Sequence, residues 1–242
     1  MRMKIGILAT GITPDDLLDD FGTYAGMVTE LFTAVGCEYR FETFDVRDGE
    51  FPASAQDCDG WVITGSKCNV YQQLDWMLRL KTLIVEIYQA QKPMLGICFG
   101  HQIIAEAFGG RVDKYPGGWG VGLHRYQLVG ENPLFTPVDQ GFTLNAMHQD
   151  QVLDKPDNAE VVAESEFCRY AALRYDNRIL TLQAHPEFSL AFEYTLVQSR
   201  KGSVVPEASA DQGLASLRGP VAATDALAVA RWMAAFLEQP RP

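Results

Sequence analysis

Positively charged residues are scarce in this sequence. Its 242 residues include 20 Lys and Arg against 31 Asp and Glu, which gives a formal net charge of −11 at pH 7. Proteins that bind DNA or RNA place clustered Lys and Arg against the phosphates. The charge balance therefore predicts that nucleic acid is not a partner. A GxxxxGK[ST] loop, which would cradle the phosphates of ATP, is also missing.

Paired cysteines and long apolar runs are missing as well. The five cysteines are odd in number, scattered and without a CxxC pair, so the sequence predicts neither a disulfide framework nor a structural zinc site. The apolar run at 4–10 is too short for a signal peptide, and no stretch approaches the length that spans a bilayer. We therefore expect a cytoplasmic protein without a membrane segment, a metal or a cofactor, whose thiols stay reduced.

The first 110 residues contain apolar runs that alternate with helical patterns. Short apolar runs at 4–10, 60–65 and 92–97 predict buried strands, and apolar residues recur at helical spacing in 19–36 and 74–91. Strands that alternate with helices form a parallel sheet with helices on both faces. The sequence thus predicts an α/β fold, with an open, mostly parallel, twisted sheet of the flavodoxin-like kind.

The pattern changes after residue 110. Four strand-like stretches follow with few helical stretches between them, which predicts a small antiparallel strand region: 121–129, 142–147, 160–165 and 170–185. No linker or repeat divides the chain, so we expect one domain over 1–242. The segment 198–221 is rich in Gly, Ser and Pro, and its composition predicts a long surface loop.

A cysteine stands at the end of the third apolar run, between two glycines. Cys98 follows "PMLGI" and precedes a helical pattern, in the spacing Gly96-x-Cys98-x-Gly100. Nucleophile elbows have this pattern, because a sharp strand-to-helix turn exposes the nucleophile and leaves no room for flanking side chains. The start of the helix favours a thiolate and leaves backbone N–H groups, such as that of Phe99, free to bind an oxyanion. The same pattern also fits a buried cysteine whose glycines only permit close packing of the helix.

A base and a carboxylate follow a later strand. In "QAHPEF", His185 and Glu187 are two residues apart, so in an extended chain both side chains point to one face. Nucleophilic thiol catalysis requires a base that is held by a carboxylate. A single His is more often structural, but this pair downstream of the Cys98 elbow favours a catalytic triad. A metal site formed by Cys98, His101, His148 and His185 is disfavoured, since their spacing matches no metal motif.

Four blocks in this order resemble the class I glutamine amidotransferases, whose glutaminase domain uses a Cys-His-Glu triad. "PMLGICFGHQIIAEAFGG" is similar to the nucleophile block of that family, and "QAHPEF" is similar to its His-x-Glu block. "VITGSKCNVY" (62–71) resembles the oxyanion strand. "MHQDQV" (147–152) resembles a segment that lines the glutamine pocket in the branch of the GMP synthase amidotransferase domain. The resemblance covers most of residues 55 to 190.

The resemblance implies a role for each matched residue. Cys98 would attack the γ-carboxamide of a glutaminyl group, His185 would transfer the protons, and Glu187 would orient the imidazole. The backbone N–H groups of Gly65 and Phe99 would hold the oxyanion. Water would then release glutamate from the thioester. The implied substrate contacts come from three of the blocks: Ser66, Gln102, Met147, His148 and Gln149.

Two residues depart from the pattern of the family. Gln149 stands where relatives that hydrolyse free glutamine often have glycine, and Ser66 stands where many members have a second glycine. Both bear on the substrate rather than on the chemistry. Since an acceptor domain that would consume ammonia is also missing, we expect glutamine hydrolysis for a separate synthase subunit. The alternative is a γ-glutamyl peptidase or hydrolase that cleaves the same amide in larger conjugates. A catalytically silent binding module on the same fold is the alternative of another class, and the intact triad disfavours it.

Overall fold

Short apolar runs form the parallel half of the central sheet. The computed structural model describes residues 2–130 and 141–240. Five parallel strands lie side by side in the order β2 (Arg40–Phe44), β1 (Lys4–Leu8), β3 (Gly60–Ile63), β4 (Met94–Ile97) and β11 (Ile179–Leu182). Strands β3, β4 and β11 are buried at every position, as expected where helices cover both faces of a sheet. The predicted α/β fold with a mostly parallel sheet is confirmed.

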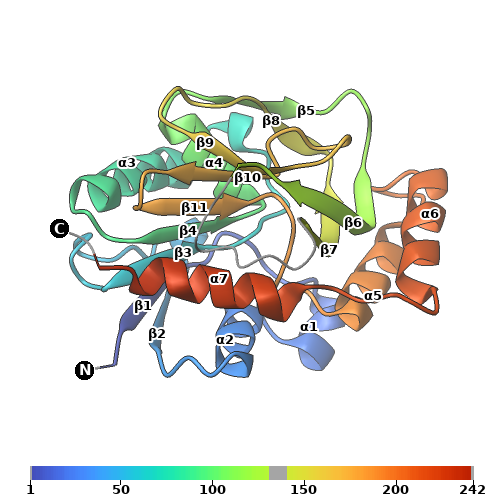
Figure 1. The fold of residues 1–242 in the computed structure, drawn as a ribbon, viewed down its shortest axis with the longest axis horizontal. Coiled ribbons are helices and arrows are strands. Elements are labelled where there is room, and N and C mark those ends of the chain that lie inside the picture. The colour runs from blue at the N-terminus through green and yellow to red at the C-terminus, as the bar shows by residue number, and fades with distance from the viewer. Residues whose placement is uncertain (1, 131–140, 241–242) are drawn as a thin grey trace.

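Four antiparallel strands extend the same sheet beyond β11. In spatial order they are β10 (Ala172–Tyr175), β9 (Glu160–Glu164), β6 (Gly120–Leu128) and β7 (Gly141–His148). A separate two-stranded antiparallel sheet pairs β5 (Arg111–Lys114) with β8 (Asp150–Asp154). The predicted antiparallel region is therefore present, and most of it is continuous with the parallel half (Figure 1).

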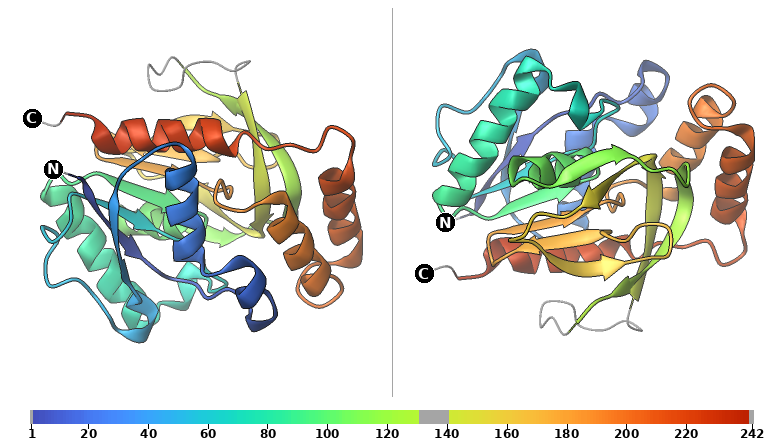
Figure 2. Two further views of the ribbon diagram at one scale, coloured as in Figure 1. Left: turned by 90° about the horizontal axis from the view of Figure 1, so that it is seen from below. Right: turned by 90° about the horizontal axis from the view of Figure 1, so that it is seen from above.

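Helices cover both faces of the sheet (Figures 1 and 2). On one face, α2 (Tyr24–Ala34) and α7 (Ala226–Glu238) share an apolar cluster with the parallel strands. On the other face, α3 (Asp75–Gln89) and α4 (Phe99–Ala107) form a second cluster. Apolar residues at helical spacing explain the burial of α3: Met77, Leu80, Ile84 and Ile87. Within the described ranges, no helix has the length and apolar composition that crossing a bilayer requires.

The segment 198–221 is not a long loop, so this prediction was wrong. Helix α5 (Leu190–Arg200) enters the segment and α6 occupies Glu207–Arg218. Gly213, which the composition marks as a loop residue, is a close-packing position, because an added Cβ would lie 2.8 Å from the Val121 side chain of β6. The face of α6 that packs on β6 has helical spacing: Ala210, Gly213, Leu214 and Leu217. The prediction failed because the amphipathic helix α6 contains small residues that are also typical of loops.

The carboxyl ends of the parallel strands meet at one edge of the sheet, next to α1 (Asp15–Phe21) and α5. Helices α1 and α5 contact each other, with the ring of Phe21 against that of Phe192, and Leu17 belongs to the same apolar cluster. The described residues also include two single turns of 3₁₀-helix, at Val46–Asp48 and Val70–Gln72. In doubly wound sheets, ligands bind at the edge that is formed by the carboxyl ends of the strands.

Candidate active site

The turn from β4 into α4 carries Cys98. Its backbone has a φ of 52° and a ψ of −102°, which is rare for a residue other than glycine. An added Cβ on Gly96 would lie 2.8 Å from the backbone of Gly100, and one on Gly100 would lie 2.4 Å from the carbonyl oxygen of Ile63. The two glycines therefore permit the sharp turn, and the strand–turn–helix arrangement that the motif predicts is present. Backbones held in sparsely populated conformations are concentrated at functional sites.

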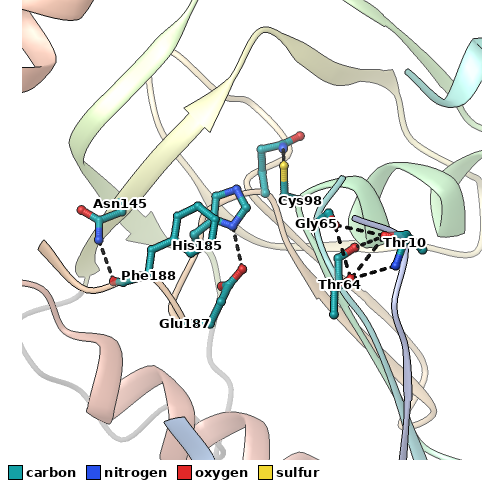
Figure 3. Close-up of polar contacts among 9 residues, drawn as sticks. Thr10, Thr64, Gly65, Cys98, Asn145, His185, Glu187 and Phe188 are labelled. Carbon is teal, nitrogen blue, oxygen red and sulfur yellow. Dashed lines mark hydrogen bonds and ion pairs between the residues drawn. The ribbon is translucent and has the colours of Figure 1, made fainter. Parts of the chain in front are cut away.

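His185 lies three residues beyond the end of β11. Its backbone N–H donates to the carbonyl oxygen of Asn145 on β7, at 2.9 Å. Its ring atom Nδ1 is 2.7 Å from Oε1 of Glu187, and both side chains are almost completely buried (Figure 3). An added Cβ on Gly65 would lie 3.0 Å from Cε1 of His185 and 3.7 Å from Cβ of Cys98, so these two residues flank the same point. The structure thus brings together the three residues of the predicted triad.

The pKa of His185 is shifted in the opposite direction from the pKa values of the other three histidines. Burial opposes its protonation, but the negative charges of Glu187 and Cys98 outweigh burial and raise the pKa of His185 well above its usual value. Burial lowers the pKa of His101 and of His148 to about 3, since neither has a carboxylate partner. All four histidines lie in the described part of the chain, and burial lowers the pKa of the fourth, His124, as well. His185 is therefore the histidine that is charged near neutral pH, and it stands beside the thiol.

The backbone on the other side of Cys98 is held by a residue at the end of β1. The Thr10 hydroxyl lies 2.8 Å from the carbonyl oxygen of Thr64 and 3.1 Å from that of Gly65, and the Thr10 N–H donates to the Thr64 hydroxyl (Figure 3). Phe99 is the first residue of α4, where backbone N–H groups have no partner within the helix. This arrangement favours the predicted oxyanion site at the N–H groups of Gly65 and Phe99. The role of Thr10 was not predicted from the sequence. The only indication of it there was the position of Thr10 just after a buried strand.

One buried glutamine contacts the thiol, and a second buried glutamine donates to the first. The side-chain nitrogen of Gln183 is 3.7 Å from Sγ of Cys98. The side-chain nitrogen of Gln102 donates to Oε1 of Gln183 at 3.1 Å and to the carbonyl oxygen of Asp150 at 2.9 Å. The Gln102 nitrogen is therefore engaged within the protein, and its contact with substrate stays a prediction. Gln183 was not predicted from the sequence as a site residue, although side chains alternate along an extended strand, so those of residues 183 and 185 point to the same side.

The other predicted substrate contacts lie where β7 passes into β8. Met147 is partly buried against the apolar clusters of α5 and α6. His148 is buried with Nδ1 3.2 Å from the Asp150 carbonyl oxygen, and the carbonyl oxygen of half-buried Gln149 accepts the Tyr115 N–H. This segment is near the base, since the positive charge of His185 is one of the causes that lower the pKa of His148.

A side-chain hydrogen bond joins this segment to the block that follows β3. The side chain of Asn69 donates to the carboxylate of Asp150. Ser66, three residues before Asn69, is half-buried and accepts the N–H of Cys68 at 3.2 Å. The contact between Asn69 and Asp150 thus brings the strand-end block of Ser66 next to the segment of residues 147–149.

His101 on α4 contacts strand β11. Its Nδ1 is 2.7 Å from the hydroxyl of Thr181 on β11, and the side chain is fully buried. It therefore ties α4 to the sheet. Among the residues that the structure describes, no group of three or more His, Cys, Asp or Glu side chains could hold a metal ion.

Known proteins resemble this chain over most of its length. The family model described as glutamine amidotransferase class-I matches residues 17–197. Gamma-glutamyl peptidase 4 of Arabidopsis thaliana is 33% identical over 175 residues, which cover 69% of this chain and 70% of that one. A glutamine-hydrolysing GMP synthase subunit of Archaeoglobus fulgidus is 31% identical over 169 residues, 69% of this chain and 85% of its own. A solved glutamine amidotransferase of Thermotoga maritima has the same fold, with a TM-score of 0.75 at 18% identity over 99% of this chain and 100% of its own.

Proposed function

The chain belongs to the class I glutamine amidotransferase family, and we propose that it hydrolyses a γ-glutamyl amide bond through a thioester on Cys98. Its relatives indicate an enzyme that acts on amide bonds. The observation that carries the proposal is the placement of Cys98, on a strained elbow, beside a buried and protonated His185 that Glu187 holds. This is the arrangement that nucleophilic thiol catalysis requires.

In the first half of the proposed reaction, the Cys98 thiolate adds to the γ-carbonyl carbon and the carbonyl electrons move to oxygen. The N–H groups of Gly65 and Phe99 donate to this oxyanion. The His185 imidazolium gives its proton to the departing nitrogen, the C–N bond breaks, and the amine leaves. Glutamate remains bound to Sγ as a γ-thioester, and His185 is neutral.

In the second half, neutral His185 takes a proton from water, and the resulting hydroxide adds to the thioester carbonyl. The C–S bond breaks, glutamate is released, and the Cys98 thiolate and the His185 imidazolium are restored. Glu187 accepts a hydrogen bond from the Nδ1–H of His185 throughout and keeps the reactive Nε2 directed away from itself. A buried carboxylate also stabilises the imidazolium that each cycle needs.

We propose that the leaving group is the amine of a γ-glutamyl conjugate. The γ-glutamyl peptidases among the relatives support this choice. Gln149 supports it too, because a long side chain replaces the glycine expected where free glutamine is hydrolysed. Free glutamine, with ammonia passed to a separate synthase subunit, is the second candidate, and the glutamine-hydrolysing GMP synthase relatives favour it.

The test is glutamate release by the purified protein from three kinds of substrate: glutamine, γ-glutamyl dipeptides and γ-glutamyl amines. An α-glutamyl dipeptide serves as the negative control. We expect turnover of the γ-glutamyl conjugates above that of glutamine, and a loss of roughly 10⁶-fold in Cys98→Ala. Cys37→Ala, which removes a half-buried thiol elsewhere, should match the wild type. Turnover of glutamine alone would select the second candidate, and no turnover of any γ-glutamyl amide would overturn the proposal.

A further inference from the structure

The ring of Phe188 lies flat against the ring of the proposed base. The centroids of Phe188 and His185 are 3.9 Å apart and the two planes differ by 5° (Figure 3). Aromatic pairs in proteins usually have centroids about 4.5–7 Å apart, with offset or edge-to-face geometry. The contact is therefore closer and more parallel than an ordinary aromatic pair.

We propose that Phe188 is a positioning residue for the catalytic base, whose ring fixes the plane of the His185 imidazole and favours its positively charged form. The proposal rests on the proposed function, in which His185 must aim one nitrogen at both the thiol and the departing amine. The hydrogen bond of Nδ1 to Glu187 fixes one point of the imidazole ring but leaves its tilt free. A second ring lying parallel to the imidazole restricts that tilt.

The charge of His185 explains why the stack is so close. The faces of aromatic rings carry partial negative charge, so two neutral rings face to face repel each other. A positively charged ring is instead attracted to the face of its neighbour. The parallel contact with Phe188 is thus favourable when His185 is an imidazolium, the form that donates a proton to the leaving group.

The other ionisable groups around His185 come from several elements. Glu187 and Cys98 face it directly, and His148 of β7 and Glu193 of α5 act on it from further away. Burial lowers the pKa of His148 to about 3 and raises that of Glu193 to about 8, so both are uncharged near neutral pH. The negative charges that raise the pKa of His185 are those of Glu187 and Cys98, and Phe188 supplies the contact with the face of the ring.

Phe188 is itself held in place from β7 and α5. The side chain of Asn145 donates to the Phe188 carbonyl oxygen at 2.8 Å, while the Asn145 carbonyl oxygen accepts the His185 N–H. One residue of β7 therefore fixes the backbone of both stacked residues. Next along the chain, the Ser189 hydroxyl caps α5 by accepting the Phe192 N–H. The Phe188 ring packs on Phe192 at 4.5 Å with an angle of 62° and is buried.

Phe188→Met removes the ring and keeps an apolar side chain of similar volume. Phe21→Met is the matched control, because Phe21 belongs to the same cluster and its ring packs on Phe192. NMR titration of the four histidines reports the pKa of His185 without substrate. We expect Phe188→Met to lower this pKa by about 0.5–1.5 units, and Phe21→Met to leave it unchanged. The kcat should fall about tenfold in Phe188→Met with little change in KM, because only the aim and charge of the base are altered.

Incorporation of pentafluorophenylalanine at position 188 is the second variant. It keeps the shape of the ring and reverses the charge of its face, so the pKa of His185 should fall further than in Phe188→Met. If Phe188→Met does not fold, this variant still tests whether the Phe188 ring raises the pKa of His185. A His185 pKa equal to that of the wild type in the folded variant would overturn the inference. A wild-type protein that cleaves no γ-glutamyl amide would instead overturn the proposed function, and the titration would still report on the stack.

Discussion

Nδ1 of His185 lies 2.7 Å from Oε1 of Glu187, with both side chains closed off from solvent. A carboxylate taken out of water needs a strong partner, and the imidazolium is that partner. The same contact orients the ring toward the elbow of Cys98. Stability and the proposed chemistry therefore depend on the same pair.

Glu187→Gln should reduce kcat by about 10²–10⁴-fold, because an amide neither stabilises the imidazolium nor selects the tautomer that leaves Nε2 able to accept a proton. Steady-state hydrolysis of the best γ-glutamyl substrate measures the effect. Circular dichroism checks that the variant is folded. The exposed Glu166→Gln is the control and should match the wild type. A Glu187→Gln variant within threefold of the wild-type kcat would contradict a role for this carboxylate in orienting the base.

Thr10→Val should lower kcat about tenfold and leave KM nearly unchanged. The substitution keeps the shape of the buried side chain but removes the hydroxyl that contacts the carbonyl oxygens of Thr64 and Gly65. The backbone would then be free to turn the Gly65 N–H away from the oxyanion, whose donors each contribute about 10²–10³ in rate. Thr10→Ser keeps the hydroxyl and should retain most of the activity. Equal rates for the Val and Ser variants would argue against this account of Thr10.

Gly100→Ala should destabilise the protein by about 1–3 kcal/mol and abolish most of its activity. The added Cβ would meet the carbonyl oxygen of Ile63 at 2.4 Å, so the start of α4 must move away from β3. Urea unfolding measures the free-energy change. Gly219→Ala is the matched control, because its Cβ would meet no atom closer than 3.9 Å. The elbow would be looser than the structure indicates if both variants unfolded at the same urea concentration.

Glu193→Gln should stabilise the protein progressively as the pH rises. Burial raises the pKa of Glu193 to about 8, so the folded protein keeps a proton that the unfolded chain loses above about pH 4.5. Unfolding then becomes easier with each pH unit between these values, and a glutamine avoids this loss. Its Oε1 accepts the N–H of Gly122, which a glutamine oxygen can also do.

The expected result for Glu193→Gln is equal stability at pH 4 to 5 and a gap on the order of a few kcal/mol at pH 8, measured by urea unfolding across this range. The exposed Glu30→Gln should follow the wild type at every pH. A gap that is constant with pH would show that Glu193 does not hold its proton in the folded protein.

Local spacing was enough to predict the parallel half of the sheet and to single out the three residues of the proposed triad. Short apolar runs that contain or border glycine are buried strands in the structure, and the glycines around Cys98 occur where the turn leaves no space for a Cβ. His185 and Glu187 are neighbours because they are two residues apart in extended chain. The helix α6 could not be predicted in the same way, because Gly213 is explained only by the close approach of β6.

The sequence by itself determined which residues have the chemistry of a thiol hydrolase and in what order they occur. Only the tertiary structure decided what supports them. Thr10 reaches Gly65 from another strand, Asn145 holds the His185 backbone across the sheet, and Phe188 meets the imidazole because the chain turns into α5 after Glu187. Such contacts join residues whose separation in the chain follows no fixed period, so they arise from packing of the whole sheet and its helices and leave no pattern in a single sequence.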